Sequence, residues 1–148
     1  MKVDVDVGSF FEANSAAGIA YAAFDENIKR IAVNAKELTV TDRLMCELIA
    51  INFALQSLQH LQFSEKTRAN AICVHISNPF VTAILNGEKP PPKGYGRWIN
   101  CIQRRADFLQ CTVSYKWAFE DDLQWVNDLA RIVTRPNSRQ SLEWALSR

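Results

Sequence analysis

One carboxylate within an apolar helix is the residue of this sequence best placed to take part in chemistry. Glu47 lies in the run from Leu44 to Leu61, where leucine and isoleucine recur at the spacing of one helical face. A buried carboxylate without a partner is costly, so Glu47 should face a cleft, a cation or a partner. The alternative is an ordinary exposed glutamate in the first helical turn, where negative charge is favoured.

A second group of acids lies near the amino terminus. Asp4 and Asp6 alternate with three valines in the stretch 3–7, and this period of two predicts a strand with one carboxylate-bearing face. Gly8 and Ser9 predict the loop that follows it. The two aspartates are either part of a site or simply paired acids that face solvent.

Composition bounds the class of protein. The chain has 148 residues, of which 48% are hydrophobic and 22% charged, which fits one globular domain. The net charge of +1 means that any electrostatic binding surface must come from local clustering. Four cysteines without Cys-x-x-Cys spacing, and two histidines, argue against a structural zinc site and favour buried, reduced thiols. Without a signal peptide or a membrane-spanning run, we expect a cytoplasmic or nuclear protein with no membrane partner.

The elements that must position these residues are strands followed by alternating helices and strands. Strands are predicted at 3–7, 18–24, 29–34, 71–76 and 111–117, and helices at 44–61, 79–85, 97–109 and 123–133. A meander followed by parallel strands is an α/β mixed sheet flanked by helices. We expect one domain over residues 1–135 and an extension over 136–148, with a short peripheral helix from Ser138 to Leu146.

At this point the chain resembles the ribonuclease H family. The resemblance is carried by four segments, namely Lys2–Asp6, Ala17–Ile19, Cys46–Leu55 and Val126–Arg131, and it covers roughly residues 2–133. It implies a five-stranded mixed sheet made of a three-strand antiparallel meander plus parallel strands. The family cleaves the RNA strand of RNA–DNA hybrids with two divalent metal ions, which four carboxylates hold beside the scissile phosphate.

When the family's four acidic positions are matched to this sequence, only one of them is clearly still an acid. Glu47 matches the helix position, whereas the end of strand 71–76 falls on Ser77 and the last helix on Asn127. The first-strand position is Asp6 if Lys2–Asp6 is matched, and Val7 if Gly8-Ser9 is matched. Asp6 and Glu47 are therefore the remaining candidate metal ligands, and we expect Glu47 to cluster with Asp6 or Asp4, where mutual repulsion would raise one pKa.

The neutral positions predict that the family's reaction is lost. Serine and asparagine bind magnesium poorly, so no cofactor is expected, and Mg²⁺ or Mn²⁺ would be used only by an altered, active site. A one-residue shift to Asp128 would restore a ligand, but neighbours on a helix point about 100° apart. Trp117 falls where many members carry a proton-shuttling histidine.

A cluster of basic residues predicts the function that would remain without catalysis. Cationic side chains surround the proline-rich segment Lys89–Gly96 and the helix after it, with Tyr95 and Trp98 interleaved: Lys89, Lys93, Arg97, Arg104 and Arg105. Family members grip the hybrid with a basic element in this region, so a nucleic-acid partner (RNA–DNA hybrid or RNA) is predicted. The alternative is a solvated helix face with Trp98 in the core.

Three functions therefore remain open. The chain is a catalytically degenerate ribonuclease H-like domain that binds nucleic acid or acts as a scaffold in a larger assembly, an active hybrid ribonuclease with an altered two-metal site, or a structural protein-interaction domain. A protein partner would dock on the proline-rich segment or on Leu142, Trp144 and Leu146.

Overall fold

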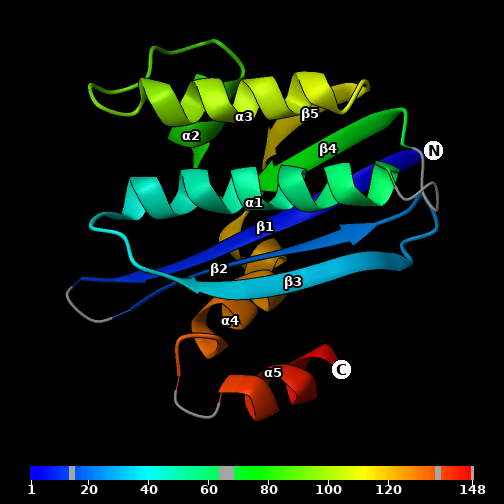
Figure 1. Cartoon of the computed structure of the whole chain (residues 1–148), viewed down its shortest axis with the longest axis vertical. Coiled ribbons are helices and arrows are strands. Elements are labelled where there is room, and N and C mark those ends of the chain that lie inside the picture. The colour runs from blue at the N-terminus through cyan, green and yellow to red at the C-terminus, as the bar shows by residue number, and fades with distance from the viewer. Residues whose placement is uncertain (14–15, 64–68, 136–137, 148) are drawn as a thin grey trace.

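A single five-stranded sheet organises the computed structural model, which describes residues 1–13, 16–63, 69–135 and 138–147 (Figure 1). The elements follow one another as β1 (Lys2–Glu12), β2 (Ala16–Phe24), β3 (Arg30–Leu38), α1 (Arg43–Phe63), β4 (Ala71–Ile76), α2 (Pro79–Leu85), α3 (Gly96–Phe108), β5 (Thr112–Trp117), the 3-10 helix η1 (Glu120–Leu123), α4 (Gln124–Ile132) and α5 (Ser138–Leu146). The strand order is β3-β2-β1-β4-β5.

The pairing of the strands confirms the predicted mixed sheet. β1 runs antiparallel to β2, and β2 antiparallel to β3, which makes the meander. β4 then lies parallel to β1, and β5 parallel to β4. Among the described residues, no helix is long and apolar enough to cross a membrane.

Helix α1 packs on one face of the sheet, called here the α1 face. Asp42 caps this helix, since its Oδ1 accepts a hydrogen bond of 2.8 Å from the Met45 N–H. The core on this side contains the inward residues of the first strand together with the apolar stripe of the helix: Val3, Val5, Val7, Leu48, Ile51 and Leu55. Helix α3 lies beside α1 on the same side (Figure 1).

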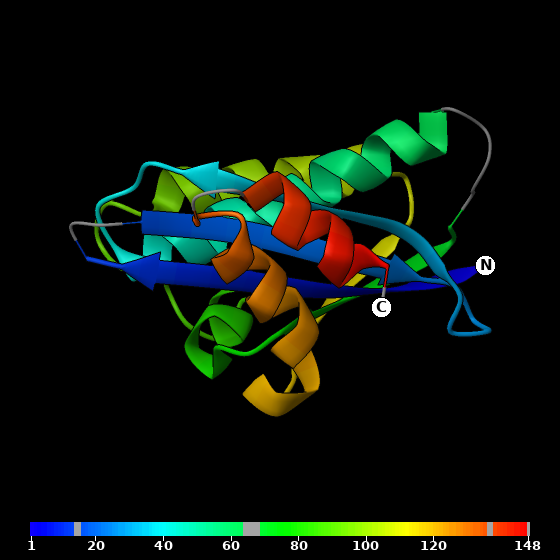
Figure 2. The same cartoon turned by 90° about the horizontal axis from the view of Figure 1, so that it is seen from below.

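Helix α4 covers the opposite face, called here the α4 face, where it packs on β1 and β2 (Figure 2). Its backbone comes very close to β1, because a Cβ built on Gly8 would lie only 2.5 Å from the carbonyl carbon of Val126. Gly18 on β2 is required for the same steric reason, because a Cβ there would lie 2.0 Å from the Ala130 carbonyl oxygen. These two glycines therefore let α4 rest directly on the sheet.

The prediction that Gly8 and Ser9 end the first strand is wrong. Both lie inside β1, and Gly8 is there because α4 leaves no space for a side chain. The predicted boundary at 135/136 adjoins residues 136–137, which lie outside the described residues, as do the predicted connections at 14–15 and 64–68. The helix predicted from Ser138 to Leu146 forms α5.

Most of the apolar side chains of α5 pack against the rest of the protein. Ala145 is buried in the core of the α4 face, and Leu142 and Leu146 pack against it. Leu142 and Leu146 are thus only partly buried, and Trp144 is 62% exposed, so docking of a protein partner on this segment stays a prediction.

Candidate functional site

Three of the positions that the resemblance assigned to acids meet where β4 ends beside β1. Val7 of β1, Glu47 of α1 and Ser77 after β4 line one small hollow. Of the two first-strand candidates, the structure therefore puts Val7, not Asp6, beside Glu47. Glu47 is then the single carboxylate that this hollow contains among its lining residues.

Glu47 is held by Asn78, which was not among the predicted site residues. Asn78 Nδ2 donates a hydrogen bond of 2.7 Å to Glu47 Oε2. The Oδ1 of the same amide accepts from the Phe80 N–H at 2.9 Å, which caps α2 and fixes the orientation of the amide. The signal available in the sequence was the pair Asn78-Pro79 directly after a buried strand.

Burial governs the ionisation of Glu47. It raises the pKa of this carboxyl above its ordinary value, while the hydrogen bond from Asn78 and the charge of Arg43 act to lower it. We expected a raised pKa from repulsion by Asp6 or Asp4. The direction agrees, but the cause is desolvation, and neither aspartate contributes.

Asn127 reaches this edge from the other side of the sheet. The parallel pairing of β1 with β4 extends only to Asp6, so β1 continues past the end of its neighbour. There the Ser9 N–H donates a hydrogen bond of 3.2 Å to Asn127 Oδ1. Asn127 therefore ties α4 to β1, and Ser9 in turn lines the hollow around Glu47.

Asp128 does not substitute for Asn127. Its Oδ1 lies 3.1 Å from Arg131 Nη2 and accepts a 2.9 Å hydrogen bond from Gln124 Nε2. Both partners lie on α4 itself, on its outer side. The expectation that Asp128 points away from the site is confirmed.

The predicted clustering of Glu47 with Asp6 or Asp4 is wrong. Side chains alternate along a strand, so Val7 faces α1 while Asp4 and Asp6 project from the α4 face. Burial raises the pKa of Asp6, with His75 lowering it and Asp4 and Asp122 raising it further. The charged groups that shift the pKa of Asp6 are therefore different from the one that shifts the pKa of Glu47.

Trp117 stands next to the site, at the end of β5. Its Nε1 donates a hydrogen bond of 3.2 Å to the Ser77 carbonyl oxygen, and its side chain is 47% exposed. Phe119 lies against it with ring centroids 4.8 Å apart and is 65% exposed. An indole donates but carries no titratable proton near neutral pH, so it replaces no proton shuttle.

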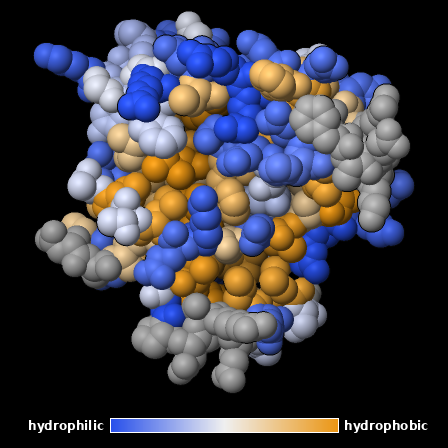
Figure 3. All heavy atoms as spheres, viewed as in Figure 1, coloured by the Kyte–Doolittle hydropathy of each residue, from blue (hydrophilic) through white to orange (hydrophobic). Residues whose placement is uncertain are grey.

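Most of the predicted basic residues are exposed. Lys89 and Lys93 project from the proline loop, defined as residues 86–95, and Arg97 and Arg104 from α3. Lys89 Nζ lies 5.7 Å from the ring centre of Phe80. Hydrophilic residues dominate the top of Figure 3, over α3. Trp98 packs against the core, as the alternative interpretation expected for that residue.

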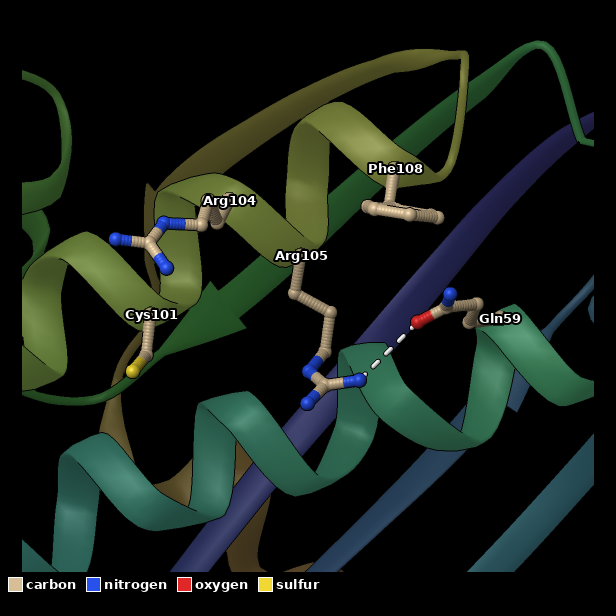
Figure 4. Close-up of a pocket in the computed structure, with 5 residues that line it drawn as sticks. All are labelled: Gln59, Cys101, Arg104, Arg105 and Phe108. Atoms are coloured by element: carbon tan, nitrogen blue, oxygen red, sulfur yellow. Dashed lines mark hydrogen bonds between the residues drawn. The ribbon is translucent and has the colours of Figure 1, made fainter.

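Arg105 differs from its neighbour Arg104 because it is committed to α1. Its Nε donates to Asn52 Oδ1 at 3.0 Å and its Nη1 to Gln59 Oε1 at 3.1 Å. Figure 4 shows Arg105 pointing to α1 and hydrogen-bonded to Gln59, while Arg104 extends sideways along α3. Arg105 therefore joins two helices, and Arg104 is the better placed of the two for a ligand.

All four cysteines are in the reduced form, as expected. Burial raises the pKa of Cys46 to about 11, with the charge of Glu47 adding to it. Cys101 is exposed, and Cys73 and Cys111 are half-buried, so the prediction that all four are buried is wrong. Cys46 is thus an inert core residue.

Comparison with solved structures gives the fold. The chain is similar to the N-terminal RNase H domain of rv2228c from Mycobacterium tuberculosis, with a TM-score of 0.79 and 15% identity over 95% of this chain and 97% of that one. It is similar to LC11-RNase H1 in complex with RNA/DNA hybrid, with a TM-score of 0.81 and 14% identity over 89% of this chain and 96% of that one.

A longer viral protein contains the same fold. The foamy viral protease-reverse transcriptase in complex with RNA/DNA hybrid is similar with a TM-score of 0.63 and 11% identity, over 90% of this chain and 20% of that one. No protein-family model and no curated protein sequence matches. The structure therefore has a ribonuclease H-like fold.

Proposed function

We propose that this chain is a ribonuclease H-like domain that binds nucleic acid without hydrolysing it. The observation that carries the proposal is the set of side chains at the four corresponding positions. Glu47 alone carries a carboxylate, while Val7, Ser77 and Asn127 occupy the other places.

These residues do not fit a pair of divalent cations. Mg²⁺ requires oxygen ligands in near-ideal geometry, and two-metal hydrolysis relies on several carboxylates to hold both ions against their mutual repulsion. Val7 offers no ligand atom, and the amide oxygen of Asn127 is already bonded to the Ser9 N–H. Glu47 itself is hydrogen-bonded to Asn78. The polar groups at this edge thus bond to one another and not to a pair of cations.

An exposed basic surface on the proline loop and α3 supports binding. The pocket beside Arg104 and Arg105 has a volume of about 280 Å³, at the lower end of the range of roughly 300–1,000 Å³ for small-molecule sites. A shallow cationic surface suits the phosphates of an extended polymer better than an enclosed small molecule. The RNA/DNA hybrid present in two of the similar structures supports the same class of ligand.

Aromatic rings beside the Glu47 edge add a second kind of contact. Trp117 and Phe119 are both largely exposed, and nucleobases stack on such rings with about 1–3 kcal/mol each. Lys116 is exposed next to them on β5. This combination of rings and cations favours a nucleic acid over an acidic protein.

Salt-dependent binding tests the proposal. Affinity for an RNA–DNA hybrid and for duplex DNA is measured over a range of salt concentrations for the wild type and for the triple variant Lys93→Ala, Arg97→Ala, Arg104→Ala. The variant should bind more weakly, and its log–log salt slope should be smaller by about 2.7, since each lost phosphate contact removes about 0.9. Arg105 is left in place because it joins α3 to α1.

A variant with equal charge loss elsewhere is the control. Lys2→Ala, Lys29→Ala, Arg135→Ala removes three exposed cations from other parts of the chain and should keep the slope. If the two triple variants bound nucleic acid equally weakly, the effect would come from net charge alone. No measurable binding by the wild type would overturn the proposal and leave the protein-interaction function.

A further inference from the structure

The α4 face of β1 and β4 gathers the metal-binding side chains that the Glu47 edge lacks. In the parallel register, Asp4 of β1 lies opposite Cys73 of β4, and Asp6 lies opposite His75. All four alternate with the buried residues that face α1. They therefore form a two-by-two block on one side of two adjacent strands.

Three of these side chains approach one another closely. The ligand atoms of Asp4, Cys73 and His75 all lie within 4.8 Å of one another. His75 Nε2 is 3.2 Å from Asp4 Oδ1. Around one tetrahedral zinc ion, ligand atoms lie roughly 3.3–3.8 Å apart, given bonds of about 2.0–2.3 Å. Small side-chain rotations are therefore enough to bring the three donors onto one ion.

The donor types select the class of metal. A thiolate, an imidazole and a carboxylate together suit Zn²⁺, Co²⁺ and similar ions, whereas Mg²⁺ and Ca²⁺ prefer oxygen alone. Three protein ligands leave one position of a tetrahedron for water or for Asp6, which faces His75 across the two strands.

The block is open to solvent. Helix α4 packs mainly on β1 and β2, and the buried apolar residues of α2 belong to the core of the α1 face. The side chains of His75 and Asp4 are 23% and 43% exposed. A cation thus has an entry path, and a metal at this place would join β1 to β4, two neighbouring strands of the sheet.

We propose that Asp4, Cys73 and His75 form a binding site for a zinc-class transition-metal ion on the α4 face of the sheet. This site is separate from the edge around Glu47 and does not depend on nucleic-acid binding. The absence of Cys-x-x-Cys spacing and the presence of only two histidines argued against a structural zinc site. The signal in a strand is instead Cys-x-His, which places both side chains on one face.

Cobalt substitution tests the site on the full chain. Co²⁺ is titrated into the reduced wild-type protein, and thiolate-to-cobalt charge-transfer absorption is followed together with direct counting of bound metal. One equivalent should bind with a charge-transfer band, Zn²⁺ should displace it, and Mg²⁺ should not. A wild type that gives no thiolate band overturns the proposal.

Matched variants decide which residues bind the ion. Cys73→Ser should abolish the charge-transfer band, and His75→Ala should weaken Zn²⁺ binding by about 100-fold or more, since even the loss of a residue that only supports a ligand costs about 10–100-fold. Cys101→Ser, which removes an exposed thiol of α3, and Glu47→Gln should leave the band unchanged. A band that persists in folded Cys73→Ser, or that disappears in Cys101→Ser, overturns the assignment.

Discussion

On the α1 face, β1 and β4 end beside a single carboxylate, that of Glu47 on α1. On the α4 face, the same two strands present Asp4, Asp6, Cys73 and His75. The strand residues on the two faces, such as Val7 and Asp6, are neighbours in the sequence. They differ because a step of one residue along a strand moves a side chain to the opposite face. What decides the chemistry of this sheet is therefore which face the acids occupy, more than how many acids the strands carry.

Moving carboxylates to the Glu47 edge should produce the largest effect. The triple change Val7→Asp, Ser77→Asp, Asn127→Asp should lower the free energy of unfolding by roughly 3 kcal/mol or more without metal, since it crowds acids around a half-buried glutamate. Mg²⁺ at about 100 times its dissociation constant should return about 2.7 kcal/mol. Denaturant unfolding with and without Mg²⁺ measures both.

Mg²⁺ is the informative ion because the thiol and imidazole on the α4 face disfavour it. Adding Glu47→Gln to the triple variant should remove most of the stabilisation by Mg²⁺. If Mg²⁺ stabilises the wild type as strongly as the triple variant, the two faces do not differ as described.

Disturbing the close contact between β1 and α4 at Gly8 should give an intermediate effect. Gly8→Ala should destabilise the fold by about 1–3 kcal/mol, because its Cβ would lie 2.5–2.7 Å from the backbone of Val126 and Asn127. Gly96→Ala is the matched control, since nothing lies within 4 Å of a Cβ there. Thermal unfolding that shows equal changes for both variants would mean that α4 does not rest on β1 at Gly8.

The ionisation of Glu47 should give the smallest effect. Because burial raises the pKa of this carboxyl in the folded state, its contribution to stability is complete below the ordinary glutamate pKa and declines as pH rises through the folded value. Glu47→Gln should therefore match or exceed the wild type at neutral pH, by at most about 1 kcal/mol for a partly exposed group. The difference should vanish in acid.

Unfolding of both proteins from acid to neutral pH measures this difference, with the exposed Glu88→Gln as control. The side-chain amide that Glu47→Gln introduces would still accept the hydrogen bond from Asn78 through its carbonyl oxygen. A clear loss of stability at neutral pH would instead reveal that the charge of Glu47 forms a stabilising pair.

Much of the fold could be predicted from the sequence because the hydrophobic pattern is strong. The apolar period of the helix at 44–61 and the valine alternation at 3–7 predicted α1 and the start of β1, and the comparisons agree with the predicted sheet. The reason for a glycine at Gly8 and at Gly18 could not be predicted, although Gly18 lies in the predicted strand 18–24. A glycine inside a strand resembles a turn signal, and only the position of α4 explains why a side chain is excluded there.

The site was harder to predict than the fold. The motif around Lys2–Asp6 favoured Asp6, whereas Gly8-Ser9 favoured Val7, and only the pairing of strands and the packing of α1 could choose between them. Contacts such as Asn78 with Glu47, or Asp4 with His75, join residues that are 31 and 71 positions apart. No local pattern encodes such a distance in space.

Hybrid cleavage is the measurement that tests the central claim most directly. The wild type and Glu47→Ala, purified identically, are incubated with an RNA–DNA hybrid in Mg²⁺ and in Mn²⁺. The absence of three carboxylates at the edge predicts that neither protein cleaves above the shared background. Cleavage by the wild type that disappears in Glu47→Ala would contradict the account and establish an altered but active two-metal site.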